Sequence, residues 1–473
     1  MKIKLIAPRV TMRPMDSAWK TQMSPPLGLL VLGSLTPSRH QVTVQDENVE
    51  KICTTDSPDL VGIGAKVDTM KRSAEIARQY RRCGIPVIMG GIHATACPEE
   101  CSKHADSVVV GEAEEIWPRL LNDAEAGRLK KIYRNDGPVD IAKSPTPDWS
   151  LLKKKSYLFT NTLTIGRGCP WRCSFCYNSS ENIDARYRMK PTSNILAEIE
   201  SLGTKHVMFI DDNFIGNPKR LKQLLPEFKR MGLTWHTAVS ADIGRHEHIL
   251  DQMAESGCKS LFIGFETVNQ KNLLHCHKTQ NRIDGYDDII SKIHERGMMV
   301  NASVVFGFDG DDPSVFSTTA DWLIRNRVST MTAHILTPYP GTRLYKRLEG
   351  EGRIIDRDLD HYNTAHAVFN PVGMSAEDLE RGYLWTYDRF YSWSGFLQRW
   401  PSARGQALAY LQFQLLYRKF GKQTAFMGRL LGMRNMAKLA KTIAYPPWRR
   451  KRVAEETVEI TASHPISYLS RVS

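Results

Sequence analysis

The sequence predicts an α/β protein with two successive domains of alternating strands and helices and a mostly helical C-terminal part. Short β-rich runs alternate with helical stretches over residues 1–133, the same rhythm resumes over residues 160–336, and it stops beyond Arg353. Strands that alternate with helices predict parallel sheets covered by helices. A chain of 473 residues is longer than a single hydrophobic core ordinarily supports, so two or three domains are expected.

The first unit, residues 1–135, is predicted to be a doubly wound, Rossmann-like sheet. Glycines follow two of its β-rich runs: Gly62 and Gly64 after one, Gly90 and Gly91 after the next. Glycine at the carboxyl end of a strand lets the backbone approach a bulky ligand closely, although such glycines also simply end strands. The β-rich runs are residues 2–7, 41–45, 60–63, 87–89 and 107–110.

The second unit, residues 159–350, follows a polar, proline-bearing linker at residues 136–158. Its strands are too few to close an ordinary eight-stranded barrel. Polar groups follow several of these strands, where the ligand-binding edge of a parallel sheet is expected. The predicted strands are residues 160–165, 206–210, 234–239, 260–263, 300–306 and 330–336.

Three cysteines directly follow the first of these strands. Cys169, Cys173 and Cys176 have the spacing C-x3-C-x2-C. Thiolates are the soft ligands that iron–sulfur clusters require. Three ligands for a cube of four irons leave one iron open to a substrate or cofactor. The alternatives are a zinc site, which usually has four ligands in paired spacing, or three unrelated buried cysteines.

This loop, with Phe175 before the last cysteine, resembles the signature of radical S-adenosylmethionine (SAM) enzymes. The resemblance implies an open (βα)6 partial barrel, with the three cysteines holding a [4Fe–4S] cluster. It also implies that the open iron binds the methionine moiety of SAM and that one electron cleaves SAM to a 5′-deoxyadenosyl radical.

The same resemblance assigns the strand-end residues to SAM. Phe175 is expected at the adenine, and Gly307 in a loop whose backbone faces the adenine. The carboxylates of Asp211 and Asp212 are expected beside the ammonium group, although an Asp-Asn turn that starts the next helix is an alternative. Glu266 is expected at the ribose hydroxyls, because a carboxylate is a natural acceptor for a diol.

The first unit resembles the cobalamin-binding domain that precedes the barrel in one branch of these enzymes. The resemblance lies in residues 24–29, 90–95 and 111–114 and implies cobalamin near Gly90 and Gly91. The D-x-H-x-x-G loop that supplies a cobalt ligand in many cobalamin proteins is absent from the sequence. His93 could approach the cofactor, or it could form only local hydrogen bonds.

The C-terminal part divides into residues 351–400 and 401–473. The first segment is rich in aromatic residues, resembles the C-terminal domain of hopanoid C-methylases, and is expected to be a lid over the barrel mouth or a packed core. The second contains twelve Lys or Arg and no acidic residue between positions 401 and 452, so it accounts for nearly all of the net charge of +13. Basic amphipathic helices of this kind suit anionic lipid, whereas nucleic acid is disfavoured and a solvated face is the alternative.

The resemblance implies a cobalamin-dependent radical SAM methyltransferase that acts on an unactivated carbon of a small or lipid-like substrate. An external electron donor of the flavodoxin or ferredoxin type is expected. Cytoplasmic localisation is expected, with peripheral contact at the inner membrane face, because the sequence has no apolar run of membrane-spanning length and its nine cysteines suit a reducing compartment.

Three other functions belong to related classes. A radical oxidative cyclase without methyl transfer is the first alternative, and an iron–sulfur electron carrier or sensor without turnover is the second. A methylthiotransferase is disfavoured because Cys53, Cys83, Cys97 and Cys101 lack the spacing of an additional cluster.

Overall fold

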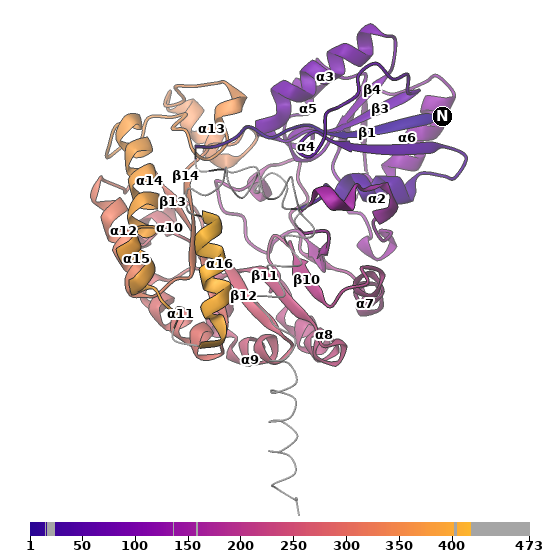
Figure 1. The fold of residues 1–473 in the computed structure, drawn as a ribbon. Helices are drawn as coiled ribbons and strands as arrows, with labels where there is room; N and C mark the ends of the chain where they lie inside the picture. The colour runs from indigo at the N-terminus through magenta and orange to yellow at the C-terminus, as the bar shows by residue number, and fades with distance from the viewer. Residues whose placement is uncertain (15, 17–23, 136, 158, 402–403, 418–473) are drawn as a thin grey trace, which may run out of the picture.

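A computed structural model describes residues 1–14, 16, 24–135, 137–157, 159–401 and 404–417. Figure 1 shows an N-terminal sheet (indigo to purple) packed on an open barrel (magenta to pink). Orange C-terminal helices lie at the left of the barrel in this view. The α/β fold class is confirmed, because both large sheets are parallel throughout.

The N-terminal sheet has the strand order β2-β1-β3-β4-β5-β6. Apolar side chains alternate along its strands, so that each face of the sheet buries its own cluster: Ile3 and Leu5 pack with Trp117 on one face, and Ile6 packs with Tyr80 on the other. The strands are β1 (Lys2–Ala7), β2 (Gln41–Asp46), β3 (Leu60–Gly64), β4 (Val87–Gly90), β5 (Ser107–Val110) and β6 (Ile132–Arg134). The helices are α2 (Leu27–Leu35), α3 (Met70–Arg82), α4 (Ile92–Ala96), α5 (Pro98–Ser102) and α6 (Ile116–Glu125).

The barrel sheet runs in chain order, β7-β10-β11-β12-β13-β14, and does not close. Its first strand is much shorter than expected, because only two residues of the predicted run 160–165 pair with β10. The strands are β7 (Thr162–Leu163), β10 (His206–Phe209), β11 (Thr234–Ser240), β12 (Cys258–Glu266), β13 (Met299–Phe306) and β14 (Thr330–Ile335). The helices between them are α7 (Thr192–Ser201), α8 (Pro218–Met231), α9 (Glu247–Glu255), α10 (Gln270–His275), α11 (Tyr286–Glu295) and α12 (Ser314–Arg325), and α13 (Arg343–Gly350) follows β14.

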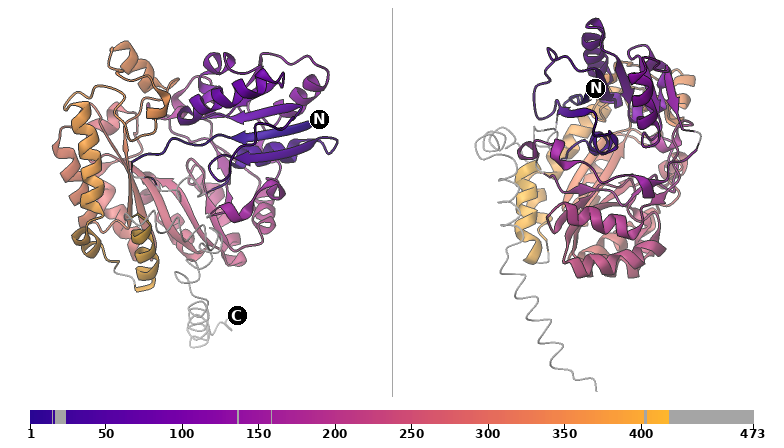
Figure 2. Two further views of the ribbon diagram at one scale, coloured as in Figure 1. Left: turned by 45° about the horizontal axis from the view of Figure 1, so that its top comes forward. Right: turned by 90° about the vertical axis from the view of Figure 1, so that its right-hand side faces the viewer.

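Helix α14 (Ala376–Phe390) packs against the open edge of the barrel, as Figure 1 and the left view of Figure 2 show. The hydroxyl of Tyr387 accepts from the amide of Ala333 (3.0 Å) and donates to its carbonyl (3.2 Å). Tyr391 bonds both backbone groups of Met331 in the same way. The helix therefore satisfies the backbone groups that an edge strand would leave unpaired. The tyrosines of α14 belong to a packed core, which was one of the two alternatives for this segment, and the lid over the barrel mouth stays a prediction.

Two short helices complete the described chain: α15 (Trp393–Gln398) and α16 (Ala407–Tyr417). Arg399 between them is buried and donates to the carbonyls of Val328, Ser329 and Phe390. Of the helices in the described residues, none is both long and apolar enough to cross a membrane. Most of the predicted basic tail, residues 402–403 and 418–473, lies outside the described residues.

Candidate active site

The cysteine loop leaves the barrel through a small antiparallel ribbon of β8 (Gly166–Arg167) and β9 (Arg188–Met189). Gly168 has φ = +79°, and a Cβ there would lie 2.4 Å from the carbonyl oxygen of Arg186. Only glycine fits this turn, which aims the loop inward. The amide of Cys169 then donates to Ala185, so the ribbon holds both sides of the loop.

The three cysteines lie in one partly buried group. All are free thiols; Cys173 is buried, and Cys169 and Cys176 are half-buried. Burial raises the pKa of each thiol, that of Cys176 to about 12, and the neighbouring thiols raise the pKa of Cys169 and Cys176 further. Within the described chain, no three metal-ligating atoms that include these sulfurs lie within 4.8 Å of one another. The soft thiolates of the three cysteines are the ligands that a [4Fe–4S] cluster requires.

Asp211 supports the start of this loop from the end of β10. Its buried carboxylate accepts from the amides of Gly166 (2.7 Å) and Ile165 (3.1 Å). Burial raises the pKa of Asp211 to about 7 against the effect of these hydrogen bonds. The adjacent Asp212 is exposed and close enough to raise the pKa of Cys169 and Cys176. Asp212 is thus the carboxylate of the pair that remains open to a cationic ligand.

Glu266 and Lys278 form a buried ion pair beside the cluster loop. The Lys278 Nζ lies 2.7 Å from Glu266 Oε1, and both side chains are about one-tenth exposed. Glu266 ends β12 with φ = +67°, an unusual conformation for a residue with a side chain. Burial by itself would lower the pKa of Lys278, but the Glu266 carboxylate and Cys173 raise it above its ordinary value. Lys278 was not predicted, because nothing in the sequence distinguishes it except its position after α10.

Two other predicted residues lie on the rim of the barrel. The ring of Phe175 contacts Phe308 edge to face, with centroids 6.3 Å apart. The amides of Gly307 and Phe308 donate to the buried carboxylate of Asp311. A Cβ on Gly307 would lie 2.8 Å from Leu379 Cδ2 in α14, so this glycine also makes room for the C-terminal helix.

The carboxyl edge of the N-terminal sheet faces this site. The rings of Tyr177, next to Cys176, and Tyr339 stack with centroids 5.1 Å apart. A Cβ on Gly341 would lie 3.0 Å from the carbonyl oxygen of Ala96 at the end of α4. The electrostatic effect of Cys97 on the pKa of Tyr177 also indicates that the two are close. Neither tyrosine was predicted, because their contact joins positions 162 residues apart in the chain.

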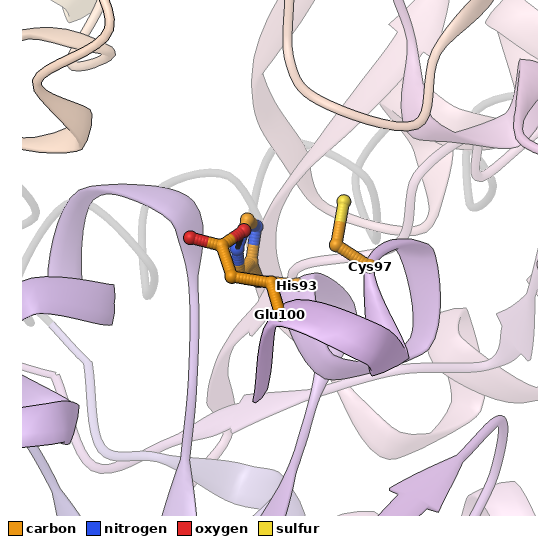
Figure 3. A group of neighbouring side chains, drawn as sticks. All are labelled: His93, Cys97 and Glu100. Carbon is orange, nitrogen blue, oxygen red and sulfur yellow. Dashed lines mark hydrogen bonds and ion pairs between the residues drawn. The ribbon is translucent and has the colours of Figure 1, made fainter. Parts of the chain in front are cut away.

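Gly90 ends β4 at this carboxyl edge, and Gly91 and His93 follow it. Gly91 has φ = +101°, and a Cβ there would lie 2.8 Å from the carbonyl oxygen of Ala65, so the glycine permits close packing of two strand ends. Figure 3 shows the imidazole of His93 beside the carboxylate of Glu100, at 3.0 Å, with the Cys97 thiol nearby. His93 is fully buried and forms the local hydrogen bond that was the alternative to a contact with the cofactor.

Comparisons with known proteins find three matching segments in the chain. Residues 163–323 match the radical SAM superfamily, residues 23–121 match the B12 binding domain, and residues 342–420 match a domain of unknown function, DUF4070. The predicted radical SAM and cobalamin-binding domains are confirmed.

Several known proteins resemble most of the chain. Bacteriochlorophyllide d C-12(1)-methyltransferase of Chlorobaculum tepidum is 29% identical over 80% of this chain and 85% of its own length. Hopanoid C-2 methylase of Rhodopseudomonas palustris is 27% identical over 71% of this chain and 66% of its own. The methyltransferase TsrM of Kitasatospora setae, solved with cobalamin and a [4Fe–4S] cluster, has 18% identity and a TM-score of 0.59 over 74% of this chain and 75% of its own, which establishes a shared fold.

Proposed function

We propose that this chain, which belongs to the radical SAM superfamily and carries a B12-binding domain, is a cobalamin-dependent C-methyltransferase. Its substrate would be a small or lipid-like molecule, methylated at an unactivated carbon. The observation that carries the proposal is that Arg167, at the start of the three-cysteine loop, pairs with Glu112 and Glu114 just after β5, at the carboxyl edge of the N-terminal sheet, where doubly wound folds bind cofactors. Several relatives that match most of the chain are named as methyltransferases or methylases, whereas a relative from Rubrivivax gelatinosus that matches 75% of the chain is named as an anaerobic magnesium-protoporphyrin IX monomethyl ester cyclase.

The cofactors supply the radical and methyl chemistry when bound, and the protein orients them and excludes water. In this proposal Cys169, Cys173 and Cys176 hold the cluster. The exposed carboxylate of Asp212 is positioned to accept from the ammonium group of SAM, while Asp211 fixes the loop.

The remaining predicted residues are assigned to the SAM nucleoside. Phe175 and the backbone at Gly307 lie on the rim where adenine is expected. Glu266 is assigned to the ribose, with Lys278 pairing its carboxylate in a buried setting. Gly90 and Gly91 are assigned to the cobalamin edge.

The test uses anaerobically reconstituted protein with cobalamin, SAM and a reductant. The expected result is formation of 5′-deoxyadenosine together with conversion of cob(I)alamin to methylcobalamin. The optical spectrum of the cobalamin monitors this conversion. The variant C169A/C173A/C176A should lose SAM cleavage, whereas the control C83A, which changes an exposed free thiol, should retain it. Wild-type cleavage by the triple variant would end the proposal.

The same assay separates the alternatives. Deoxyadenosine without methylcobalamin would favour a radical reaction without methyl transfer, as in an oxidative cyclase. A reducible cluster without deoxyadenosine would favour a non-catalytic iron–sulfur protein. A flavodoxin or ferredoxin is proposed as the donor, and either should replace the chemical reductant.

We also propose peripheral contact with the inner face of an anionic membrane through residues 401–473. The described chain leads into this basic segment with the exposed side chains Leu397 and Trp400, which are 66% and 44% exposed. Apolar and aromatic side chains beside basic residues suit a lipid interface. Co-sedimentation with anionic liposomes should be lost on truncation after Gln398, and no sedimentation of the full chain at low salt would refute this contact.

A further inference from the structure

The ribbon that carries the cluster loop is tied to the N-terminal domain by four charged side chains. Arg167, two residues before Cys169, lies beside Glu112 (3.2 Å) and Glu114, both of which follow β5. Arg188, directly opposite Arg167 in the ribbon, donates to both oxygens of Glu112 at 2.7 and 2.9 Å. We call these four residues the carboxylate–arginine clamp.

Each charged side chain of the clamp has an ion-pair partner, and the clamp is partly shielded from water. Its exposed side-chain fractions are 24% for Glu112, 9% for Glu114, 26% for Arg167 and 19% for Arg188. Two positive and two negative charges balance, so no charge is left buried without a partner. The planar guanidinium groups hold the carboxylates in a defined orientation, which a lysine could not reproduce.

The linker also joins the clamp. The Ser144 hydroxyl donates to Glu114 (3.0 Å) and accepts from Arg167 (3.1 Å). Arg188 donates to the carbonyl of Val139 at 2.9 Å. The clamp therefore connects the cofactor edge of the first domain, the linker and the cluster ribbon.

No other ion pair joins the first domain to the barrel among the described residues of 1–135 and 159–350. The remaining interdomain ion pairs go to the segment after the barrel, from Lys71 to Asp358 (3.1 Å) and Asp360 (3.2 Å). The clamp is thus placed at the cluster end of the interface, where it sets the position of the loop that follows Arg167.

We propose that Glu112 and Glu114 are positioning residues, which act through Arg167 and Arg188 to fix the cluster loop relative to the cobalamin edge. This inference rests on the proposed function, because it concerns the alignment of SAM on the cluster with cobalamin in the other domain. SAM cleavage depends on the cluster loop and the SAM contacts within the barrel, whereas transfer between the two cofactors also depends on the distance between domains. Loosening the clamp should therefore separate the two reactions.

The test compares E112Q/E114Q with the wild type and with E181Q, which changes a highly exposed glutamate paired with Lys346. The double variant should form methylcobalamin at least about tenfold more slowly, because small misplacements of reacting groups have large kinetic effects. Its rate of 5′-deoxyadenosine formation should stay within about twofold of the wild type, because SAM cleavage takes place within the barrel and does not require the reacting groups of the two domains to be aligned. E181Q should match the wild type in both.

Two further measurements keep the inference testable. Hydrogen exchange of the cofactor-free protein should rise at residues 166–168 and in the linker for E112Q/E114Q, while strands β12 and β13 stay unchanged. If the double variant fails to fold, R167K keeps the charge but not the forked geometry and should show the same separation of rates.

The outcomes distinguish this inference from the proposed function. Equal slowing of both reactions, or unchanged rates with either variant, would overturn the positioning role. Absence of methylcobalamin in the wild type would end the proposed function instead. In that case the hydrogen-exchange measurement alone would test the positioning role of Glu112 and Glu114. Unchanged exchange at residues 166–168 and in the linker would refute that role.

Discussion

The hydroxyl of Tyr387 provides a direct measure of how the C-terminal helix stabilises the open barrel. It accepts from the Ala333 amide and donates to the Ala333 carbonyl, and the ring is almost fully buried. Tyr387→Phe keeps the ring and leaves one backbone donor and one acceptor buried without partners. At about 1–3 kcal/mol for each unsatisfied group, with partial relaxation, the local stability of β14 should fall by about 3 kcal/mol.

Hydrogen exchange of a peptide spanning β14 is the appropriate assay, because unfolding of a multidomain chain need not be two-state. A loss of about 3 kcal/mol corresponds to roughly hundredfold faster exchange from the opened state. The matched control is Tyr345→Phe, whose hydroxyl bonds Glu349 at the surface (3.2 Å) and should change local stability by less than about 0.5 kcal/mol. Exchange of β14 within about threefold of the wild type in Tyr387→Phe would refute the edge-capping role, since that is below 1 kcal/mol.

Three further predictions concern the interior of the two domains. Gly91→Ala should destabilise the N-terminal domain by about 1–3 kcal/mol, because its Cβ would strike the Ala65 carbonyl at positive φ. Hydrogen exchange of a peptide spanning β4 in the cofactor-free protein checks this, with Gly28→Ala as the unstrained control, and equal exchange in both variants and the wild type would contradict it. Lys278→Met should cost about 3–5 kcal/mol by leaving the buried Glu266 carboxylate without its ion-pair partner, and adding Glu266→Gln should restore much of that loss. Hydrogen exchange of a peptide spanning β12 checks this, and a further loss of stability in the double variant would be the contrary result. Burial lowers the pKa of His236 from 6.5 to about 4, so the neutral imidazole favours folding above pH 6.5 and this contribution is lost as the pH falls toward 4. The fall in the free energy of unfolding between pH 6.5 and 4 should be smaller in His236→Gln than in the wild type, by on the order of 3 kcal/mol. Parallel profiles of stability against pH for the two proteins would refute this prediction.

Local sequence patterns determined the cluster loop and the two-domain order. The spacing of Cys169, Cys173 and Cys176 is set within eight consecutive residues, and Gly168 before them makes a turn that only glycine fits. The alternation of β-rich and helical runs likewise depends on neighbours in the chain. Such signals survive in a single sequence because the residues that act together are close in it.

The tertiary structure alone decided which residues surround that loop. The expected pair Asp211 and Asp212 divides into a buried support and an exposed carboxylate because only the first reaches the amides of the neighbouring strand. The aromatic spacing around Tyr387 predicted a helix but not its contact with a strand edge. Glu112 meets Arg188 across 76 residues, and periodicity carries no information about such long-range pairs, because they form only when separate elements fold together.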